Sequence, residues 1–451
     1  MGRLFGTDGV RGIANKELTP ELAFNLGKAG TFVLKKNAAR PVIVIGKDTR
    51  VSGDMLENAL TAGILAVGGN VIKAGVIPTP AGVAYLARHY GADAGIVISA
   101  SHNTFEYNGI KFFNGDGFKL DDLLEEKIED LIISSVDVNS HITGEEIGKC
   151  LEAEGNSIEL YAKHLIETAD FRLDGRKVVL DCANGASYQV APKVYEALGA
   201  EVVAIGDRPD GTNINDACGS THPEKLQAAV LAHHADIGLA FDGDADRLIV
   251  VDERGRVLDG DKTIAICAKM LKAEGRLKDD KVTVTVMSNI GFHKAMEAEG
   301  ISVDVTGVGD RYVLEQMLKT GCVIGGEQSG HIIFLEHTTT GDGILSSLQL
   351  VKAVLASGRK ISELADEIQI YPQVLVNAKI NNDYKKTYMK DEEVAMAIAA
   401  IEAKMEGNGR VLIRPSGTEP LVRVMLEGDD TDLIANLAED LAALIEKKFR
   451  R

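Results

Sequence analysis

Three stretches of the chain repeat the same alternation of short apolar runs and longer amphipathic segments. Each stretch begins with a β-branched run, continues through a segment with helical spacing that ends at glycine, and returns to a second apolar run. They span residues 42–75, 178–206 and 282–307. Short apolar strands separated by helices are typical of βαβ units, in which helices cover both faces of a parallel or mixed sheet. The pattern therefore predicts three related α/β domains with mixed sheets.

The C-terminal part does not follow this repeat. Apolar runs at 411–414 and 421–426 predict two strands around a loop, and residues 431–448 have the spacing of an amphipathic helix. Four leucines recur at intervals of four and three residues, which places them on one helical face: Leu433, Leu437, Leu441 and Leu444. We expect a smaller α+β domain at the end of the chain.

Length and the polar breaks between the repeats set the domain organisation. A chain of 451 residues exceeds the size at which a single hydrophobic core stops growing. Breaks in the apolar pattern fall at 134–156, at 251–255 and at Ile370-Tyr-Pro372. We predict four domains, at 1–153, 154–253, 254–369 and 370–451.

Charge and composition exclude several classes of partner. Apolar residues make up 45% of the chain and charged residues 26%, as in ordinary globular proteins, and the formal net charge is -18. Such a charge repels nucleic acid and anionic membranes, so we expect neither as a partner. An anionic ligand would need a local cluster of arginine and lysine.

The cysteines and the N-terminus bear on location. The five cysteines are odd in number and never form a CxxC pair, which favours a reducing cytoplasm over a disulfide framework or a zinc site. We expect no signal peptide, because the first residues lack an apolar core, and no apolar run approaches the length of a membrane span. The prediction is a cytoplasmic protein. The sequence does not indicate a subunit interface, so whether the protein forms a homodimer is left undecided at this point.

A serine turn is the first candidate for chemistry. The apolar run 95–98 leads into the polar segment Ser99-Ala-Ser-His-Asn103, and apolar character returns around Lys111. This pattern predicts a buried strand, an exposed turn and a second strand, with Ser101 and His102 held on rigid supports. The simpler interpretation is a Ser/Asn turn that bonds its own backbone. The stretch alone leaves both open.

Asp242-Gly-Asp-Ala-Asp-Arg247 is the strongest local signal. In an extended strand the three aspartates would be spaced by roughly 6.6 Å, too far apart to share one small ion, but Gly243 allows the chain to curl. Clustered hard oxygen donors favour Mg²⁺ or Ca²⁺. An EF-hand is excluded, because Arg247 stands where that loop needs glycine and apolar strands replace its helices. A solvated acidic turn is the alternative.

Three further loops carry side chains that are suited to binding a ligand. Arg414-Pro-Ser-Gly-Thr-Glu-Pro420, followed by Arg423, suits a phosphate dianion, although a Pro/Gly hairpin is the alternative. Gly325-Gly-Glu-Gln-Ser-Gly-His331 offers groups that bind sugar hydroxyls, although a plain turn explains it as well. Near the N-terminus, Arg11 follows a glycine-rich turn and is a phosphate-grade donor.

Together these stretches resemble the α-D-phosphohexomutase superfamily, and most closely its bacterial branch that acts on glucosamine phosphates. The serine, aspartate, sugar and phosphate loops occur in the superfamily's order and span nearly the whole chain. Residues 5–12 and 209–215 and Gln328 resemble the glucosamine branch. Two positions depart from the pattern, since Thr104 stands where proline is usual and Tyr107 where aspartate is common.

The resemblance implies interconversion of glucosamine 6-phosphate and glucosamine 1-phosphate, a reaction that feeds UDP-N-acetylglucosamine and cell-wall synthesis. A phosphoserine at Ser101 and a sugar 1,6-bisphosphate, which is also the activator, would carry the phosphoryl group. The implied Mg²⁺ ligands are Ser101, Asp242, Asp244 and Asp246. The implied catalytic residues around Ser101 are Arg11, His102, Lys111 and Arg247, with Lys111 as the proton carrier. The implied substrate-binding residues are Glu327 and Ser329 for the sugar and Arg414, Ser416, Gly417, Thr418 and Arg423 for the phosphate.

Two alternatives stay open at this point. A phosphomannomutase or phosphoglucomutase of the same superfamily would use the same loops on another phosphosugar. A non-catalytic binding protein switched by phosphorylation of Ser101 would explain Ser101 and Arg414, but it gives no reason for the sugar loop.

Overall fold

A computed structural model describes residues 4–6, 9–35, 40–136, 138, 142–385, 387–405, 407–416 and 419–450. The chain divides into two compact units, residues 1–287 with 300–366, and residues 288–299 with 367–451. No helix among the described residues is long and apolar enough to cross a lipid bilayer. All five cysteines are described and none forms a disulfide; Cys150 is exposed and the other four are buried.

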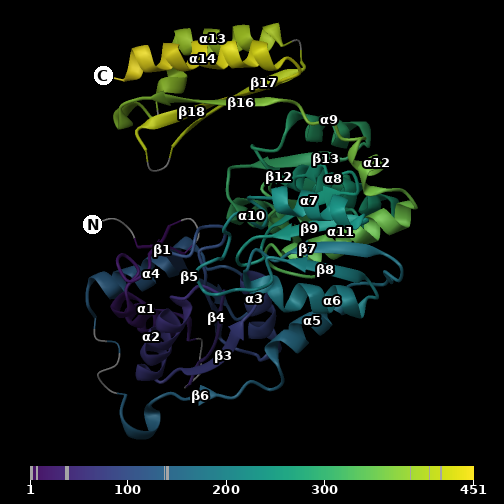
Figure 1. Ribbon diagram of the computed structural model, residues 1–451. Helices are drawn as coiled ribbons and strands as arrows, with labels where there is room; N and C mark the ends of the chain where they lie inside the picture. Colours follow the sequence, from purple (N-terminus) through teal and green to yellow (C-terminus); the bar gives the residue numbers. More distant parts are fainter. Residues whose placement is uncertain are drawn as a thin grey trace. The chain divides into compact units, whose positions relative to one another are not determined.

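The first sheet of the larger unit has six strands in the order β1-β5-β4-β2-β3-β6. Its strands are β1 (Val10–Ile13), β2 (Val42–Lys47), β3 (Asn70–Val76), β4 (Ala94–Ile98), β5 (Tyr107–Asn114) and β6 (Cys150–Leu151). Helices α1 (Pro20–Leu34), α2 (Gly53–Ala66) and α4 (Asp122–Ile133) pack on one face, and α3 (Thr79–His89) lies on the other (Figure 1). The central strands are therefore buried on both sides.

The second sheet has five strands in the order β11-β10-β9-β7-β8, and the third has four in the order β13-β12-β14-β15. The strands are β7 (Lys177–Asp181), β8 (Glu201–Ile205), β9 (Ile237–Phe241), β10 (Leu248–Asp252), β11 (Val257–Leu258), β12 (Lys281–Thr285), β13 (Ser302–Thr306), β14 (Ile324–Gly326) and β15 (Ile332–Phe334). The helices are α5 (Ser157–Glu167), α6 (Val190–Ala197), α7 (Glu224–His233), α8 (Gly260–Ala273), α10 (Asp310–Thr320), α11 (Gly343–Ser357) and α12 (Ile361–Ala365). Both α8 and α11 contact strands of the two sheets and join them into one body.

The three sheets contain the same four-strand pattern, in the orders β5-β4-β2-β3, β10-β9-β7-β8 and β15-β14-β12-β13. In each, the first strand of the repeat pairs in parallel with the second and third, and a hairpin leads from the third to an antiparallel fourth. The predicted three related α/β domains with mixed sheets are confirmed. The serine, aspartate and sugar loops occupy the same hairpin of successive repeats.

The smaller unit contains an antiparallel sheet in the order β16-β18-β17. Its strands are β16 (Gln373–Lys379), β17 (Gly409–Pro415) and β18 (Leu421–Gly428). Helices α13 (Glu392–Lys404) and α14 (Thr431–Phe449) lie together on one face of this sheet (Figure 1). The smaller α+β domain predicted for the end of the chain is confirmed. Short 3₁₀ helices in the chain are Gly144–Glu146, Ala186–Tyr188, Lys278–Asp280, Asn382–Tyr384 and Tyr388–Lys390.

The buried face of α14 differs slightly from the predicted one. Leu437 and Leu441 are buried, but Leu433 is 37% exposed. The stripe against the sheet passes instead through Ile434 and Ile445, and Leu444 is only partly buried beside it. Two intervals of four residues, from Leu433 to Leu441, drift by about 80° around a helix of about 3.6 residues per turn, which leaves Leu433 outside the stripe.

Residues 288–299, which include α9 (Ile290–Ala298), belong to the smaller unit although they lie between β12 and β13 in sequence. Buried Glu427 holds them there: its Oε2 accepts the Ile290 amide at 2.9 Å and Nε of Arg410 at 2.7 Å. The Asn289 side chain donates to the Tyr371 carbonyl at 2.9 Å. The predicted domain boundaries at 153, 253 and 369 stay predictions, since the two units do not separate the three sheets.

Candidate active site

Ser101 lies in the hairpin between β4 and β5, at the carboxyl end of a central strand. Ligands of open α/β sheets bind at such ends. Ser101 has a left-handed backbone, with φ of +54°, which is uncommon for a residue with a Cβ. The predicted exposure is wrong for Ser101, which is only 1% exposed, whereas Thr104 and Glu106 further along the turn are exposed. The aspartate loop covers it closely: a Cβ on Gly243 would lie 2.5 Å from the Ser101 carbonyl oxygen, so only glycine fits there.

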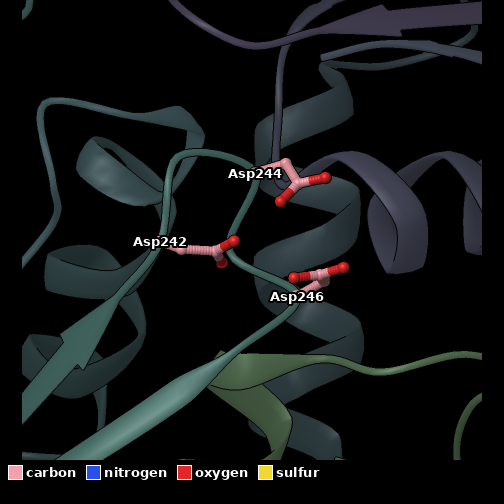
Figure 2. A group of neighbouring side chains, drawn as sticks. All are labelled: Asp242, Asp244 and Asp246. Atoms are coloured by element: carbon pink, nitrogen blue, oxygen red, sulfur yellow. The ribbon is translucent and has the colours of Figure 1, made fainter. Parts of the chain in front are cut away.

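Three aspartates converge in the hairpin between β9 and β10. Asp242, Asp244 and Asp246 are buried, and each offers a carboxylate oxygen within 4.8 Å of the others. Figure 2 shows the three carboxylates turned toward a common space beside the loop. The predicted curl of the chain is therefore present, and this group could hold a metal ion.

The electrostatics of the aspartate loop favour a bound cation. Burial, together with the neighbouring charges of Asp246 and Asp244, raises the pKa of Asp242 well above its usual range. Burial also acts to raise the pKa of Asp246, but the His331 imidazole, with Nδ1 3.3 Å from Oδ2 of Asp246, and the charges of Lys111 and Arg247 together hold that pKa below its usual range. Three buried carboxylates at this spacing repel one another unless a cation lies between them.

The donor set fits a small divalent cation. Oδ1 of Asp244 and Oδ1 of Asp246 are buried, and neither accepts a hydrogen bond from the residues that the structure describes. The Ser101 hydroxyl donates to Oδ2 of Asp242 at 2.7 Å, so a fourth oxygen borders the same space. Hard oxygen donors of this kind favour Mg²⁺ or Ca²⁺ over softer metals.

Cationic side chains surround the serine and aspartate loops. Lys111 on β5 is 2% exposed, and its Nζ lies 3.1 Å from Oδ2 of Asp244. The Arg247 amide donates to Oδ1 of Asp242 at 3.1 Å. Nδ1 of His102 is 3.3 Å from the Ser101 hydroxyl, and burial, with Arg247 and Arg11, lowers the pKa of His102. The structure thus brings the predicted catalytic residues together.

The sugar loop joins β14 to β15 and lies beside Arg247. Oε1 of Glu327 accepts the Gly309 amide at 3.1 Å, and the Ser329 hydroxyl is 3.4 Å from Oε2 of Glu327. Arg247 forms a β-bridge with His331 at the end of this loop. Gln328 turns away from Glu327 and donates to the Asp259 carboxylate at 3.3 Å. The sugar and aspartate loops therefore form one continuous surface.

The sequence analysis missed three residues of this site. His331 is buried between Asp246 and Asp310, with Nε2 3.6 Å from Oδ2 of the latter. Its position directly after the sugar loop was the available signal. Arg50 and Asn215 both donate to the Ser101 carbonyl, at 3.0 and 2.9 Å. Neither contact could be predicted from the residues next to them in the sequence.

The phosphate loop lies in the smaller unit, between β17 and β18. Arg414 and Arg423 stand directly opposite each other on the two strands, and burial, with the charge of Arg423, lowers the pKa of Arg414. Lys385 adds a third cation, since its Nζ donates to the Ser416 carbonyl at 2.8 Å. Like charges paired across strands are unfavourable, so this cluster suits an anion. Gly417 and Thr418, also predicted to bind phosphate, lie outside the described residues.

Asp342, which caps α11 beside the aspartate loop, gives a pH-dependent prediction. Burial raises its pKa from an ordinary 3.8 to about 6, against hydrogen bonds from Leu345 and Tyr161. Because the folded state binds this proton more tightly, stability is lost as pH rises from about 4 through about 6, by up to about 3 kcal/mol. Relative to wild type, the free energy of unfolding of Asp342→Asn should therefore rise as pH increases from about 4 to about 6 and stay higher above pH 6. The gain will be smaller than the full amount because the Tyr161 hydroxyl loses its acceptor.

Urea unfolding in EDTA between pH 4.5 and 8 measures the difference in the free energy of unfolding between Asp342→Asn and wild type. The exposed N-cap of α14, Asp430, supplies the control, because Asp430→Asn removes a helix-capping carboxylate that is not buried and should bring no comparable gain in stability. A difference between Asp342→Asn and wild type that does not change with pH would contradict the assignment.

Family models match the chain from end to end. They are the phosphoglucomutase/phosphomannomutase alpha/beta/alpha domains I, II and III, at residues 2–137, 159–255 and 259–371, and the C-terminal domain of the same proteins, at residues 375–444. The chain belongs to the phosphoglucomutase/phosphomannomutase family and is an enzyme of the mutase class.

Comparison with similar proteins indicates which kind of mutase this chain resembles. The chain is 58% identical over 449 residues to a phosphoglucosamine mutase of a Thermoanaerobacter species, covering 100% of both chains. Among solved structures, it superposes with a TM-score of 0.80 and 24% identity on a phosphoglucomutase/phosphomannomutase family protein from Burkholderia thailandensis, covering 99% of this chain and 98% of the other. An Aspergillus fumigatus N-acetylphosphoglucosamine mutase, solved with GlcNAc-6P and magnesium, gives 0.71 at 17% identity, with 99% and 96% covered. These last two show the shared fold.

Proposed function

We propose that this enzyme is a phosphoglucosamine mutase, which interconverts glucosamine 6-phosphate and glucosamine 1-phosphate for the synthesis of UDP-N-acetylglucosamine and the cell wall. The observation that carries the proposal is the Ser101 hydroxyl, hydrogen-bonded at 2.7 Å to one of three clustered, buried aspartates. A phosphoryl group at this position needs charge neutralisation, and the surrounding cations supply part of it. Identity of 58% to a phosphoglucosamine mutase over the whole chain supports the choice of sugar.

In the proposed reaction Ser101 carries the phosphoryl group. The bond from Oγ to phosphorus breaks as a bond from phosphorus to O1 of glucosamine 6-phosphate forms, and Lys111 takes the proton from O1. The resulting 1,6-bisphosphate reorients in the site. The bond from phosphorus to O6 then breaks as a bond from phosphorus to Oγ of Ser101 forms, and Lys111 returns the proton to O6, which yields glucosamine 1-phosphate. Transfer of this kind depends mainly on positioning and on charge stabilisation.

We assign the neighbouring residues to these two tasks. Arg11, Arg247 and His102 would neutralise and orient the transferring phosphoryl group, with His102 near enough to Oγ to exchange a proton. Glu327 and Ser329 would bind the sugar hydroxyls. Arg414, Ser416, Gly417, Thr418 and Arg423 would hold the phosphate that is not reacting.

We propose Mg²⁺ as the cofactor, held by Ser101, Asp242, Asp244 and Asp246, and a sugar 1,6-bisphosphate as activator. When bound, the ion would stabilise the negative charge on the phosphoryl oxygens. A phosphoserine carries about -1.5 to -2 charges, so a cation is needed for it to lie beside three carboxylates. The A. fumigatus mutase was solved with magnesium. We place the enzyme in the cytoplasm, because its five cysteines are free thiols.

Turnover on glucosamine 6-phosphate, with Mg²⁺ and a trace of glucose 1,6-bisphosphate, tests the proposal. We expect kcat/KM to be higher on glucosamine 6-phosphate than on mannose or glucose 6-phosphate. A preference for either neutral sugar would move the enzyme to the phosphomannomutase or phosphoglucomutase branch. Absence of turnover on all three would favour the non-catalytic phosphoprotein.

A further inference from the structure

A closed ring of buried hydrogen bonds passes under the serine turn. The Ser101 amide donates to the Ser99 hydroxyl at 3.0 Å, and that hydroxyl donates to Oδ2 of Asp48 at 2.6 Å. Nε of Arg50 donates to the same Oδ2 at 2.8 Å, and its Nη2 donates to the Ser101 carbonyl at 3.0 Å. The ring therefore begins and ends on the backbone of Ser101.

The Arg50 guanidinium also reaches the rest of the turn. Its Nη2 donates to the Asn103 carbonyl at 2.8 Å, and its Nη1 donates to the carbonyls of Thr104 and, at 3.0 Å, Tyr107. One side chain thus gathers four carbonyls. Two of them belong to Thr104 and Tyr107, so this one side chain acts as a clamp on the turn.

Asn215 binds two of the same carbonyls from the loop that follows β8. Its Nδ2 lies 2.9 Å from the Ser101 carbonyl oxygen and 2.9 Å from that of Asn103. Each of these carbonyls therefore accepts one hydrogen bond from Arg50 and one from Asn215, which uses both lone pairs of the oxygen. The turn is held between two separate repeats of the fold.

Stability alone does not account for this clamp. The Arg50 and Asp48 side chains are both 0% exposed, and a buried ion pair is often no more stabilising than apolar residues of the same volume. Apolar residues, however, could not satisfy the four carbonyls, nor hold Ser101 in its left-handed conformation, which is unfavourable for a residue with a Cβ. The hydrogen bonds of Arg50 and Asn215 therefore fix the backbone geometry of the serine turn.

We propose that Arg50 is a positioning residue for phosphoryl transfer, which fixes the serine turn so that Oγ of Ser101 stays beside the aspartate loop. Asn215 secures the same turn from its other side. This inference rests on the proposed mutase function. Arg50 touches neither the substrate nor the reacting oxygen, so its loss affects the rate of transfer and leaves sugar binding in place. A displacement of about 1 Å is enough to slow such a reaction about 10²-fold.

Arg50→Lys tests this role, because lysine keeps a charge beside Asp48 but cannot reach four carbonyls. We expect kcat on glucosamine 6-phosphate, and the rate at which Ser101 takes phosphate from glucose 1,6-bisphosphate in a quenched-flow mass measurement, to fall about 10²-fold. KM should stay within about threefold. Asn215→Gly, which removes the amide but keeps the left-handed backbone at φ +59°, should give a smaller fall in kcat with the same unchanged KM.

Arg256→Lys is the matched control. Arg256 also pairs with a buried aspartate, Asp252, and donates to a backbone carbonyl, that of Ser362, but it lies away from the serine turn. We expect its kcat to stay within about twofold of wild type. Wild-type kcat in Arg50→Lys, or a fall no larger than in Arg256→Lys, overturns the inference. If Arg50→Lys does not fold, Asn215→Gly decides, and wild-type kcat in that variant overturns it. Lack of turnover by wild type would instead refute the proposed function.

Discussion

Replacing Ser101 by alanine is expected to lower kcat on glucosamine 6-phosphate by about 10⁴-fold or more, because it removes the hydroxyl that we propose carries the phosphoryl group. Serine and alanine share the same Cβ, so the left-handed backbone at φ +54° costs the same in both and the fold should be retained. Intact mass spectrometry after incubation with glucose 1,6-bisphosphate should show one added phosphoryl group on wild type and none on Ser101→Ala.

Ser187→Ala controls for the loss of a buried hydroxyl. Ser187 is also fully buried, and its hydroxyl contacts the Cys182 carbonyl at 3.4 Å. This variant should keep both turnover and the added mass. If Ser101→Ala took up as much phosphate as wild type, the phosphoserine would lie elsewhere and the proposed mechanism would be wrong.

Asp242→Asn should give the second-largest effect, a fall in kcat of about 10³-fold. The amide oxygen can still accept from the Arg247 amide, and the amide nitrogen can donate to Oγ of Ser101 in place of the present hydrogen bond, so the change removes one of three clustered charges with little change of shape. Without metal, the variant should be as stable as wild type or more stable, because like-charge repulsion is relieved. We expect millimolar Mg²⁺ to raise the melting temperature of wild type, and this rise should be absent in Asp242→Asn.

Asp181→Asn is the matched control for this experiment. Asp181 is a buried carboxylate at the end of β7 whose pKa burial also raises, but it lies outside the aspartate loop. Its variant should keep the Mg²⁺-dependent rise. An equal rise in Asp242→Asn would place the metal elsewhere. Asp244→Ala is a less clean test, since it would leave the buried Lys111 ammonium without this partner at 3.1 Å.

Local patterns in the sequence were sufficient to predict many of the strands and the loops that carry the site, but not, for example, β1 or β16. Apolar runs mark β4, β9 and β14, and a polar or glycine-rich segment follows each. Strand order was beyond local pattern: β1 pairs with β5 about a hundred residues away, with Val10 opposite Ile110. The pairing of each hairpin onto its sheet, which makes the three repeats equivalent, depends on such long-range contacts.

The candidate site divides in the same way. Ser101 and the three aspartates were predicted because their types and spacing already indicate their chemistry. Arg50, Asn215 and His331 were not, since an arginine, an asparagine or a histidine acquires its role from what lies across the fold. The hydrogen bond from Asn215 to Ser101 spans 114 residues of sequence. The burial of Ser101 follows from the same contacts and was missed for the same reason.

The distribution of thiols makes the natural chain suitable for distance measurements by spin labelling. Cys150, on β6 of the larger unit, is exposed, whereas the other four cysteines are buried, and burial raises the pKa of the Cys218 thiol to about 11. Labelling at neutral pH should therefore favour one native position, with no cysteine removed. A second label at Met396→Cys, a 73% exposed site on α13 of the smaller unit, would report the separation of the two units in solution, before and after a phosphosugar is added.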